Sequence, residues 1–175
     1  MPYWFHCNFS LDERQVRYVL VGGVALLNYV EGRNTQDIDL IVTLADLEKV
    51  PEITVESLDN PYFARGTFQG LQIDILLTKN PLFGQVQQKY VAKQAFVERE
   101  VSIATVEGLL LLKLYALPSL YRQGDFVRVS IYENDIAALM YAYQPDMEAI
   151  LEELEGYVGA GDMGSLREIV AEIEE

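Results

Sequence analysis

Hydrophobic and polar positions follow one period in the first part of this chain and another in the last part. Up to about residue 104, apolar residues form short runs that end in turn residues, as strands do. Beyond it, apolar residues recur every three or four positions, as on amphipathic helices. The pattern predicts an α+β fold, with an antiparallel or mixed sheet flanked by helices over residues 10–104 and a helical C-terminal part over residues 105–175 packed on it.

The strands of the sheet are predicted from short apolar runs bounded by turn signals. They cover Tyr18–Val21, Asp37–Val42, Tyr62–Phe68, Leu71–Leu77 and Val101–Ala104. Gly22-Gly23 directly follows the first run and precedes an apolar, helix-like segment over Val24–Val30. Gln69-Gly70 joins the third and fourth runs and is typical of a tight hairpin. Residues 51–60 are interpreted as a loop or an irregular strand.

Four helices are predicted in the C-terminal part from apolar residues at helical spacing. They cover Val106–Leu117, Ile131–Tyr143, Asp146–Tyr157 and Ser165–Glu175. Pro118 is expected to end the first helix, because proline has no backbone N–H and its ring clashes with the preceding turn. Residues 119–129 are then expected to form a loop, and the glycine-rich residues 156–164 another. Lys113 lies on a helix that is apolar nearly all round, so it needs a partner or must extend to solvent.

Three aspartates interrupt the apolar runs of the predicted sheet. Asp37 and Asp39 alternate with apolar residues, so on a strand both carboxylates point to the same face. Two such carboxylates repel each other unless a cation lies between them, and Mg²⁺ prefers oxygen ligands of this kind. Asp74 lies inside the run Leu71–Leu77, where an unpaired buried carboxylate would be costly. We therefore expect Asp74 on the open face of the sheet, beside Asp37 and Asp39.

The glycine pair has a ligand-binding interpretation and a structural one. Gly22 and Gly23 let a ligand approach the backbone closely, and amide groups near the start of a helix favour anions. The pair is also compatible with an ordinary tight turn, with Asp37 and Asp39 as a helix cap and a solvated strand end. Each piece alone favours the structural interpretation, whereas the ordered set favours the ligand-binding one.

The ordered set of motifs resembles the nucleotidyltransferase superfamily related to DNA polymerase beta. An apolar run ends in Gly22-Gly23, thirteen residues lie between Gly23 and Asp37, and a later strand carries Asp74. More narrowly, the segment GRNTQDIDL, residues 32–40, is similar to the Arg-x-Thr-x-Asp-h-Asp-h motif (h, hydrophobic) of the AbiEii-like toxins. The resemblance implies that residues 10–104 form a nucleotidyltransferase-fold catalytic domain.

The resemblance also implies a mechanism with two Mg²⁺ ions. Asp37 and Asp39 would hold Mg²⁺ on the triphosphate of an NTP, and Asp74 would share the second ion and help to deprotonate the attacking hydroxyl. Gly22 and Gly23 would lie against the phosphates. The reaction would move an NMP from the NTP to a hydroxyl of a tRNA 3′ end, a protein or a small molecule, and the residues do not choose among these acceptors.

Four further residues are expected to bind the nucleotide. Arg33 and Thr35 lie in the loop before Asp37, where a guanidinium can pair with phosphate oxygens. A surface salt bridge is the alternative for Arg33. Lys113 and Asp135 match a lysine and an aspartate that help to bind nucleotide in the AbiEii-like group. A salt bridge that only joins two helices is the alternative for this pair.

The charge of the chain limits its partners. Lysine and arginine number 13 against 27 aspartates and glutamates, and the formal net charge is −14. Nonspecific nucleic-acid binding needs basic residues, so a tRNA acceptor would have to meet a local basic patch. The acidity also suits a binding or antitoxin-type protein on the same fold, with weak or no catalysis, which is the alternative function. The resemblance to AbiEii-like toxins implies instead a toxin with a cognate antitoxin as its partner.

The remaining composition is that of a globular protein from a reducing compartment. Half of the residues are hydrophobic, which is enough for a core. The single cysteine, Cys7, rules out an intrachain disulfide and a thiolate metal cluster. No apolar run approaches the roughly 20 residues of a transmembrane helix, and no signal-peptide pattern is present. We therefore expect a cytoplasmic protein with no membrane partner.

Overall fold

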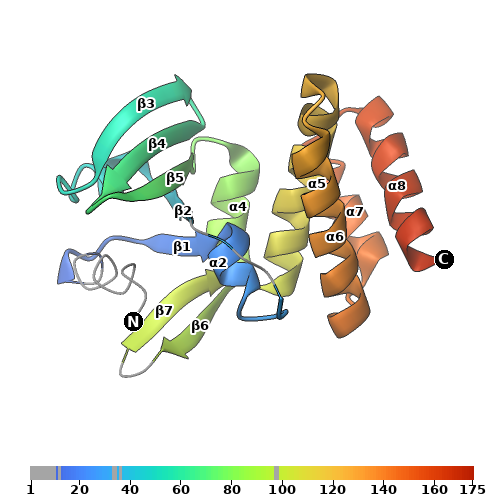
Figure 1. Cartoon of the computed structure of the whole chain (residues 1–175), viewed down its shortest axis with the longest axis horizontal. Helices are drawn as coiled ribbons and strands as arrows, with labels where there is room; N and C mark the ends of the chain where they lie inside the picture. The colour runs from blue at the N-terminus through green and yellow to red at the C-terminus, as the bar shows by residue number, and fades with distance from the viewer. Residues whose placement is uncertain (1–10, 12, 33–34, 36, 97–98) are drawn as a thin grey trace. The chain divides into compact units, whose positions relative to one another are not determined.

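Runs rich in β-branched residues form strands because such side chains pack well on a pleated, buried surface. The computed structural model of the chain describes residues 11, 13–32, 35, 37–96 and 99–175. In it, a sheet with helices is followed by a set of helices (Figure 1). The chain divides into two units, Met1–Thr105 and Val106–Glu175. The α+β class predicted from the sequence is confirmed.

Seven strands form the sheet across the described part of the chain, in the order β3-β4-β5-β2-β1-β7-β6. Their bounds are β1 Tyr18–Val21, β2 Ile38–Val42, β3 Thr54–Asn60, β4 Phe63–Phe68, β5 Leu71–Leu77, β6 Val91–Phe96 and β7 Arg99–Ala104. β2 pairs antiparallel with β1 and parallel with β5, so the sheet is mixed, as predicted. The strand that carries Asp39, β2, is therefore central, with a neighbour on each side.

The predicted hairpin is present between β4 and β5. Gln69 and Gly70 adopt left-handed backbone angles, with φ of 49° and 83°, as a two-residue hairpin turn requires. Residues 54–60 form strand β3, whose pairing with β4 shifts register at two points, so the irregular strand is the alternative that the structure shows. Strand β6 was not predicted. Each of these strands pairs with a single neighbour at an edge of the sheet, where exposed polar residues weaken the hydrophobic pattern.

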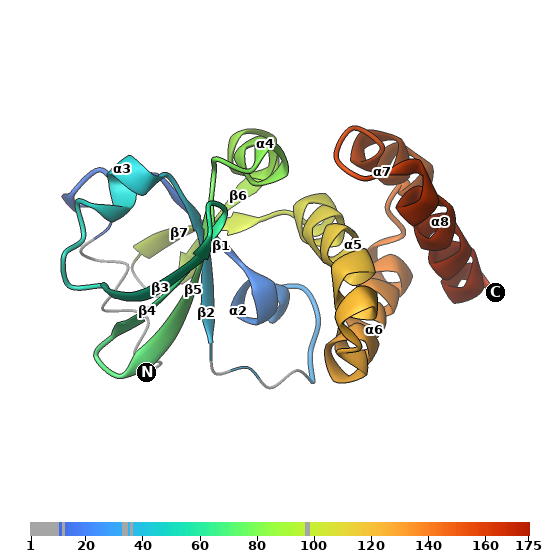
Figure 2. The same cartoon turned by 90° about the horizontal axis from the view of Figure 1, so that it is seen from above.

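Three helices of the first unit cover the sheet: α2 Gly22–Leu26, α3 Leu44–Leu47 and α4 Pro81–Lys89. Figure 2 shows the sheet edge-on, with α2 and α4 on one side and α3 on the other. The α2 helix starts at the glycine pair itself and ends earlier than the predicted segment 24–30. The core between the layers includes Ile41, Phe83 and Leu82, all fully buried.

The described helices of the second unit are α5 Val106–Gln123, α6 Phe126–Tyr143, α7 Met147–Leu154 and α8 Ala160–Glu174. The prediction that Pro118 ends the first helix was wrong, because α5 continues through it for five more residues. A proline inside a helix costs about 3 kcal/mol. Leu117, Pro118 and Leu120 are all buried, and we attribute the continuation of the helix to this packing.

The loop predicted over residues 119–129 is correspondingly short. Only Gly124 and Asp125 separate α5 from α6. The N-cap of α6 is Asp125, whose side chain accepts a hydrogen bond from the backbone N–H of Arg128 at 3.2 Å, and the start predicted at Ile131 was wrong. The glycine-rich loop is also shorter than predicted, because α8 already begins at Ala160.

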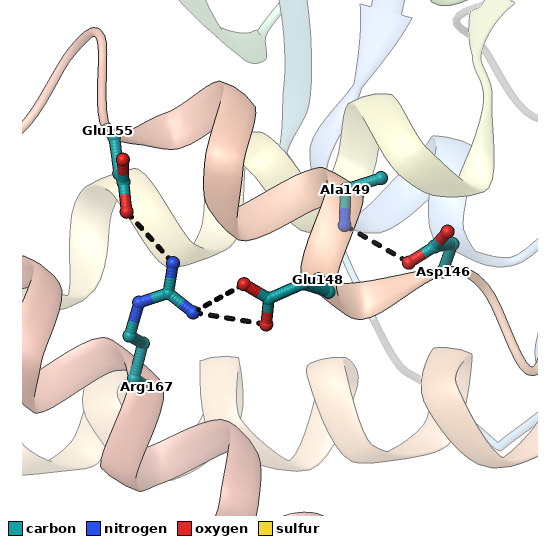
Figure 3. Close-up of polar contacts among 5 residues, drawn as sticks. All are labelled: Asp146, Glu148, Ala149, Glu155 and Arg167. Atoms are coloured by element: carbon teal, nitrogen blue, oxygen red, sulfur yellow. Dashed lines mark hydrogen bonds and ion pairs between the residues drawn. The ribbon is translucent and has the colours of Figure 1, made fainter.

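The two last helices are joined through Arg167 of α8 (Figure 3). Its guanidinium meets Glu148 at the start of α7 at 2.9 Å and Glu155, just beyond the end of α7, at 2.8 Å. Asp146 caps α7 by accepting a hydrogen bond from the backbone N–H of Ala149 at 3.1 Å. The hydrogen bonds from Arg167 to Glu155 and Glu148 raise the pKa of its guanidinium above the ordinary value.

No helix in the described part of the chain combines the length and the apolar character that crossing a membrane requires.

Candidate active site

A row of charged side chains runs across the middle of the sheet. Arg65 of β4 is opposite Asp74 of β5, and Asp74 is in turn beside Asp39 of β2. Residues that are register partners on neighbouring strands point to the same face of a sheet. The structure therefore brings Asp39 and Asp74 together on adjacent parallel strands, on one face, as the sequence predicted for these two aspartates.

Gly22 lies directly against the carboxylate of Asp39. It follows β1, whose last residue, Val21, is the register partner of Asp39, and its φ of +63° is in the left-handed region. A Cβ atom at Gly22 would lie 2.0 Å from Oδ2 of Asp39. A side chain at this position would therefore displace the carboxylate, and the glycine is required by space as well as by backbone conformation.

Gly23 has the same relation to Thr35. A Cβ atom at Gly23 would lie 2.6 Å from the Oγ1 atom of Thr35, so the loop before β2 packs on the start of α2. Asp37 lies one residue before β2 and is exposed. The structure thus gathers Gly22, Gly23, Thr35 and Asp39 at one end of β1 and β2, whereas Arg33 is outside the described residues.

The carboxylate of Asp74 has partners from its own hairpin. Arg65 donates from Nε to Oδ1 at 2.9 Å and from its second terminal nitrogen to Oδ2 at 3.5 Å. Gln72 donates to Oδ1 at 3.3 Å. The Asp74 side chain is 25% exposed, so this ion pair is open to solvent and to a ligand. Arg65 therefore pairs with the Asp74 carboxylate and orients it.

Arg65 is the site residue that sequence reasoning did not place. Two residues form the turn at Gln69-Gly70, so Phe68 pairs with Leu71 and, three residues back along each strand, Arg65 pairs with Asp74. Counting outward from the predicted turn would have found this pair. The sequence therefore contained the information that pairs Arg65 with Asp74, provided that the turn has two residues.

The aspartates provide the hard oxygen donors that Mg²⁺ prefers. Asp39 fits such an ion because the missing side chain of Gly22 leaves its Oδ2 atom beside bare backbone, and Asp37 is exposed to solvent nearby in sequence. Within the described ranges, no group of three or more His, Cys, Asp or Glu side chains lies close enough to share an ion. Asp74 meets Arg65 instead.

Lys113 and Asp135 contact each other inside the helical unit. The Nζ atom of Lys113 on α5 lies 2.8 Å from Oδ2 of Asp135 on α6, and the two side chains are 6% and 8% exposed. The same ammonium lies 4.3 Å from the ring centroid of Tyr132. The salt bridge between Lys113 and Asp135, one of the two alternatives from the sequence, is therefore present. The nucleotide-binding role of the pair stays a prediction.

We expect Lys113→Met to lower the free energy of unfolding by about 3–5 kcal/mol, because it leaves the charge of Asp135 buried without its ammonium. The double variant Lys113→Met/Asp135→Leu should recover much of this loss, since neither charge then remains. Urea unfolding of both variants measures the effect. If the Lys113–Asp135 pair also binds nucleotide, the double variant will be stable but will bind NTP weakly. Unchanged NTP binding would mean that the pair only joins the two helices.

A hollow on the opposite face of the sheet has no part in this chemistry. It is lined by apolar side chains and Tyr18, among them Leu20, Leu40 and Ile73. Leu40 is adjacent to Asp39 in β2, so the two side chains point to opposite faces. Among the residues that the structure describes, its lining has no charged group, and the candidate active site is therefore the face that carries Asp39.

Comparison with known proteins connects this arrangement to a fold. The sequence matches no protein-family model, and no curated protein sequence matches it. The structure is similar to that of an antigenic nucleotidyltransferase-like protein from Paracoccidioides brasiliensis, with a TM-score of 0.58 and 16% identity over 92% of this chain and 88% of the other.

The structure is also similar to the antibiotic-resistance factor ANT(2'')-Ia. Its solution structure has a TM-score of 0.58 and 13% identity over 94% of this chain and 87% of the other. Its crystal structure in complex with adenylyl-2''-tobramycin has a TM-score of 0.57 and 13% identity over 93% of this chain and 96% of the other. The chain therefore has the fold of nucleotidyltransferase-like proteins.

Proposed function

We propose that this chain is a metal-dependent nucleotidyltransferase that moves an NMP from an NTP to a hydroxyl acceptor. The observation that carries the proposal is the contact between Asp39 and Gly22, where a Cβ atom would lie 2.0 Å from the carboxylate. Asp74 lies in register beside Asp39 on the neighbouring parallel strand. A side chain at residue 22 would fill the space beside this carboxylate, which glycine leaves open for a ligand.

Each residue then has a defined role. Asp37 and Asp39 would hold Mg²⁺, which would supply positive charge near the triphosphate. The backbone at Gly22 and Gly23 would lie close to the phosphates, because no side chain separates them. Asp74 would accept the proton of the acceptor hydroxyl, whose oxygen would form the bond to the α-phosphorus as pyrophosphate leaves. Thr35 packs the loop before β2 against Gly23, and Arg33 of that loop would pair with phosphate oxygens.

The class of acceptor is inferred from the net charge of the chain, because no single contact identifies it. The net charge of −14 opposes binding of RNA and favours a neutral or cationic acceptor. The structurally similar ANT(2'')-Ia has been solved in complex with adenylyl-2''-tobramycin. On the charge argument, a basic protein or a small cation that carries a hydroxyl is a better acceptor than tRNA. The narrower AbiEii-like assignment adds a toxin function and a cognate antitoxin, with tRNA or protein as the acceptor.

The experiment that tests the proposal incubates the full chain with each α-³²P-labelled NTP and Mg²⁺. Parallel reactions contain total tRNA, a protein lysate or tobramycin. We expect label transfer to one acceptor class and none when EDTA removes the metal. Transfer to tRNA would support the toxin assignment over the charge argument. Label transfer in none of the reactions, together with no Mg²⁺-dependent NTP binding, would overturn the proposal.

A second candidate function is nucleotide binding without transfer. The observation that favours it is the ion pair between Arg65 and Asp74, which occupies the carboxylate that would accept the proton. Such a protein would bind NTP with Mg²⁺ and release it unchanged, as a regulatory or antitoxin-type protein would. Mg²⁺-dependent NTP binding without label transfer in the same experiment would identify this function.

The variant Arg65→Gln separates the two functions. If Asp74 is the proton acceptor, we expect kcat to fall roughly 10- to 100-fold, because Asp74 loses the guanidinium that orients it. The KM for NTP should change little, since Arg65 lies on β4, which pairs with β5 and is one strand away from β2. Arg65→Lys should restore part of the activity. A variant with unchanged or higher kcat would show that the ion pair has no positioning role or holds Asp74 inactive.

A further inference from the structure

The hairpin of β4 and β5 presents three pairs of side chains on the face of the sheet that carries Asp39. Register partners on neighbouring strands share a face, and so do alternate residues of one strand. The pairs on this face are Phe63–Leu76, Arg65–Asp74 and Thr67–Gln72, and Asp74 in turn pairs with Asp39. All of these side chains on the hairpin are exposed or half-buried, so a ligand can reach them. We call the three pairs the β4–β5 surface.

The chemistry of the β4–β5 surface changes from one pair to the next. Phe63 is 38% exposed, and its ring packs edge-on against Phe83 of α4 with centroids 5.2 Å apart, so helix α4 fixes the aromatic end. The ion pair of Arg65 and Asp74 lies in the middle. At the other end, Thr67 and Gln72 provide a hydroxyl and an amide, which are neutral and both donate and accept hydrogen bonds.

The position of this surface suits the acceptor of the proposed reaction. In the sheet, β1 with the following glycine pair is on one side of β2, and the β4–β5 hairpin is on the other side. The attacking oxygen enters roughly in line with the leaving pyrophosphate, and the base must lie within about 3 Å of that oxygen. If the triphosphate lies against Gly22 and Gly23, the acceptor hydroxyl therefore reaches Asp74 over β4 and β5.

We propose, on the basis of the proposed function, that Phe63, Thr67 and Gln72 bind the acceptor, and that the acceptor is a small compound of one or two hydroxylated rings. The C–H surface of a ring packs on Phe63, and hydroxyls at its edge exchange hydrogen bonds with Thr67 and Gln72. One further hydroxyl gives its proton to Asp74. Its oxygen forms the bond to the α-phosphorus as the bond from that phosphorus to pyrophosphate breaks.

The size and charge of the β4–β5 surface favour this class of acceptor over macromolecules. Alternate residues of a strand are about 6.7 Å apart, so the three pairs extend about 13 Å along the strands and about 5 Å across them. One or two rings span this distance, whereas a protein partner buries roughly 800 Å² on each side. An RNA acceptor needs several cations for its phosphates, and the single cation of this surface, Arg65, is paired with Asp74.

Binding can be tested apart from the reaction by titrating the full chain with tobramycin, myo-inositol or methyl β-glucoside, without NTP or Mg²⁺. Two-dimensional NMR follows the methyl group of Thr67 and the side-chain amide of Gln72. We expect at least one of these compounds to shift both signals with a Kd of roughly 10⁻⁴–10⁻² M, because the contacts are few and open to solvent. Shifts at other residues only, or no shifts up to about 20 mM, would overturn the inference even where NTP binding and label transfer are intact.

The variants Thr67→Val and Gln72→Leu test the same residues during transfer to the compound that binds. We expect each to raise the KM for this acceptor roughly 3- to 10-fold, the effect of one lost hydrogen bond, with no change in the KM for NTP. Gln72→Leu should also lower kcat, since Gln72 donates to Asp74. The matched control is Gln94→Leu on β6, whose register partner Val101 lines the hollow on the opposite face, and it should change neither KM.

Phe63→Leu tests the aromatic end of the surface. It keeps an apolar side chain and removes the ring, so the acceptor KM should again rise roughly 3- to 10-fold. Urea unfolding reports separately on the lost packing against Phe83. An acceptor KM that none of the three variants changes, or label transfer to tRNA or protein alone, would overturn the inference and leave the proposed function intact. Absence of transfer to every acceptor would contradict both.

Discussion

Replacement of Asp39 with asparagine is expected to lower nucleotidyl transfer by about 10³-fold or more, with little change in stability. Asparagine has nearly the same shape as aspartate, so its packing against Gly22 is retained. The negative charge is lost, and with it the ability to hold Mg²⁺ on the triphosphate. Transfer of label from α-³²P-NTP at saturating Mg²⁺ measures the effect, and thermal unfolding measures stability.

The matched control for Asp39→Asn is Glu56→Gln. Glu56 lies on the edge strand β3 and is exposed, so this variant removes one carboxylate charge from the same sheet outside the candidate site. It should transfer label at the wild-type rate. Full activity in Asp39→Asn would mean that the carboxylate contacts neither metal nor substrate, and the proposed site would then be abandoned even if the fold is retained.

Replacement of Gly22 with alanine should abolish activity and also destabilise the first unit. Two costs combine, because alanine at a φ of +63° costs about 1–2 kcal/mol and its Cβ atom would overlap Oδ2 of Asp39 at 2.0 Å. Relief of such an overlap costs about 1–3 kcal/mol more and moves the carboxylate. We therefore expect a loss of roughly 3 kcal/mol in the free energy of unfolding, measured in urea.

Gly70→Ala separates the two costs of the Gly22 variant. Gly70 has a φ of +83° in the turn between β4 and β5, and nothing lies within 4 Å of the position that its Cβ atom would take. It should therefore show the backbone cost of about 1 kcal/mol alone and keep full activity. Equal losses in Gly22→Ala and Gly70→Ala would show that Gly22 serves only the turn, and that Asp39 does not depend on the space beside it.

The glycine pair is a part of the candidate site whose local structure the sequence predicted. Its position after an apolar run predicted a turn into a helix, which is where β1 ends and α2 begins. The alternation around Asp39 predicted a strand with its carboxylate on one face, and β2 has this form. Both features are local, since they depend on residues within a few positions of each other along the chain.

Pro118 and Arg65 have structural roles that the local sequence pattern does not predict. The proline has the intrinsic effect of ending a helix, but Leu117 and Leu120 beside it are buried, and packing between helices outweighs a cost of about 3 kcal/mol. The sequence places Arg65 on a predicted strand and does not decide whether it lies near the site. Its contact with Asp74 appears only when the turn at Gly70 sets the register of the hairpin.

By itself, the sequence determined the α+β class, the change from strands to helices near residue 105, and the order of the glycine pair and the aspartates along the chain. These features depend on the hydrophobic period and on residue types that favour turns. Both are properties of residues close together in the chain. Only the tertiary structure decided that β5 lies parallel to β2, so that Asp74 is beside Asp39, and that Oδ2 of Asp39 occupies the space left by Gly22. Those contacts join residues far apart in the chain, and the free energy that selects them comes from burial of the whole sheet.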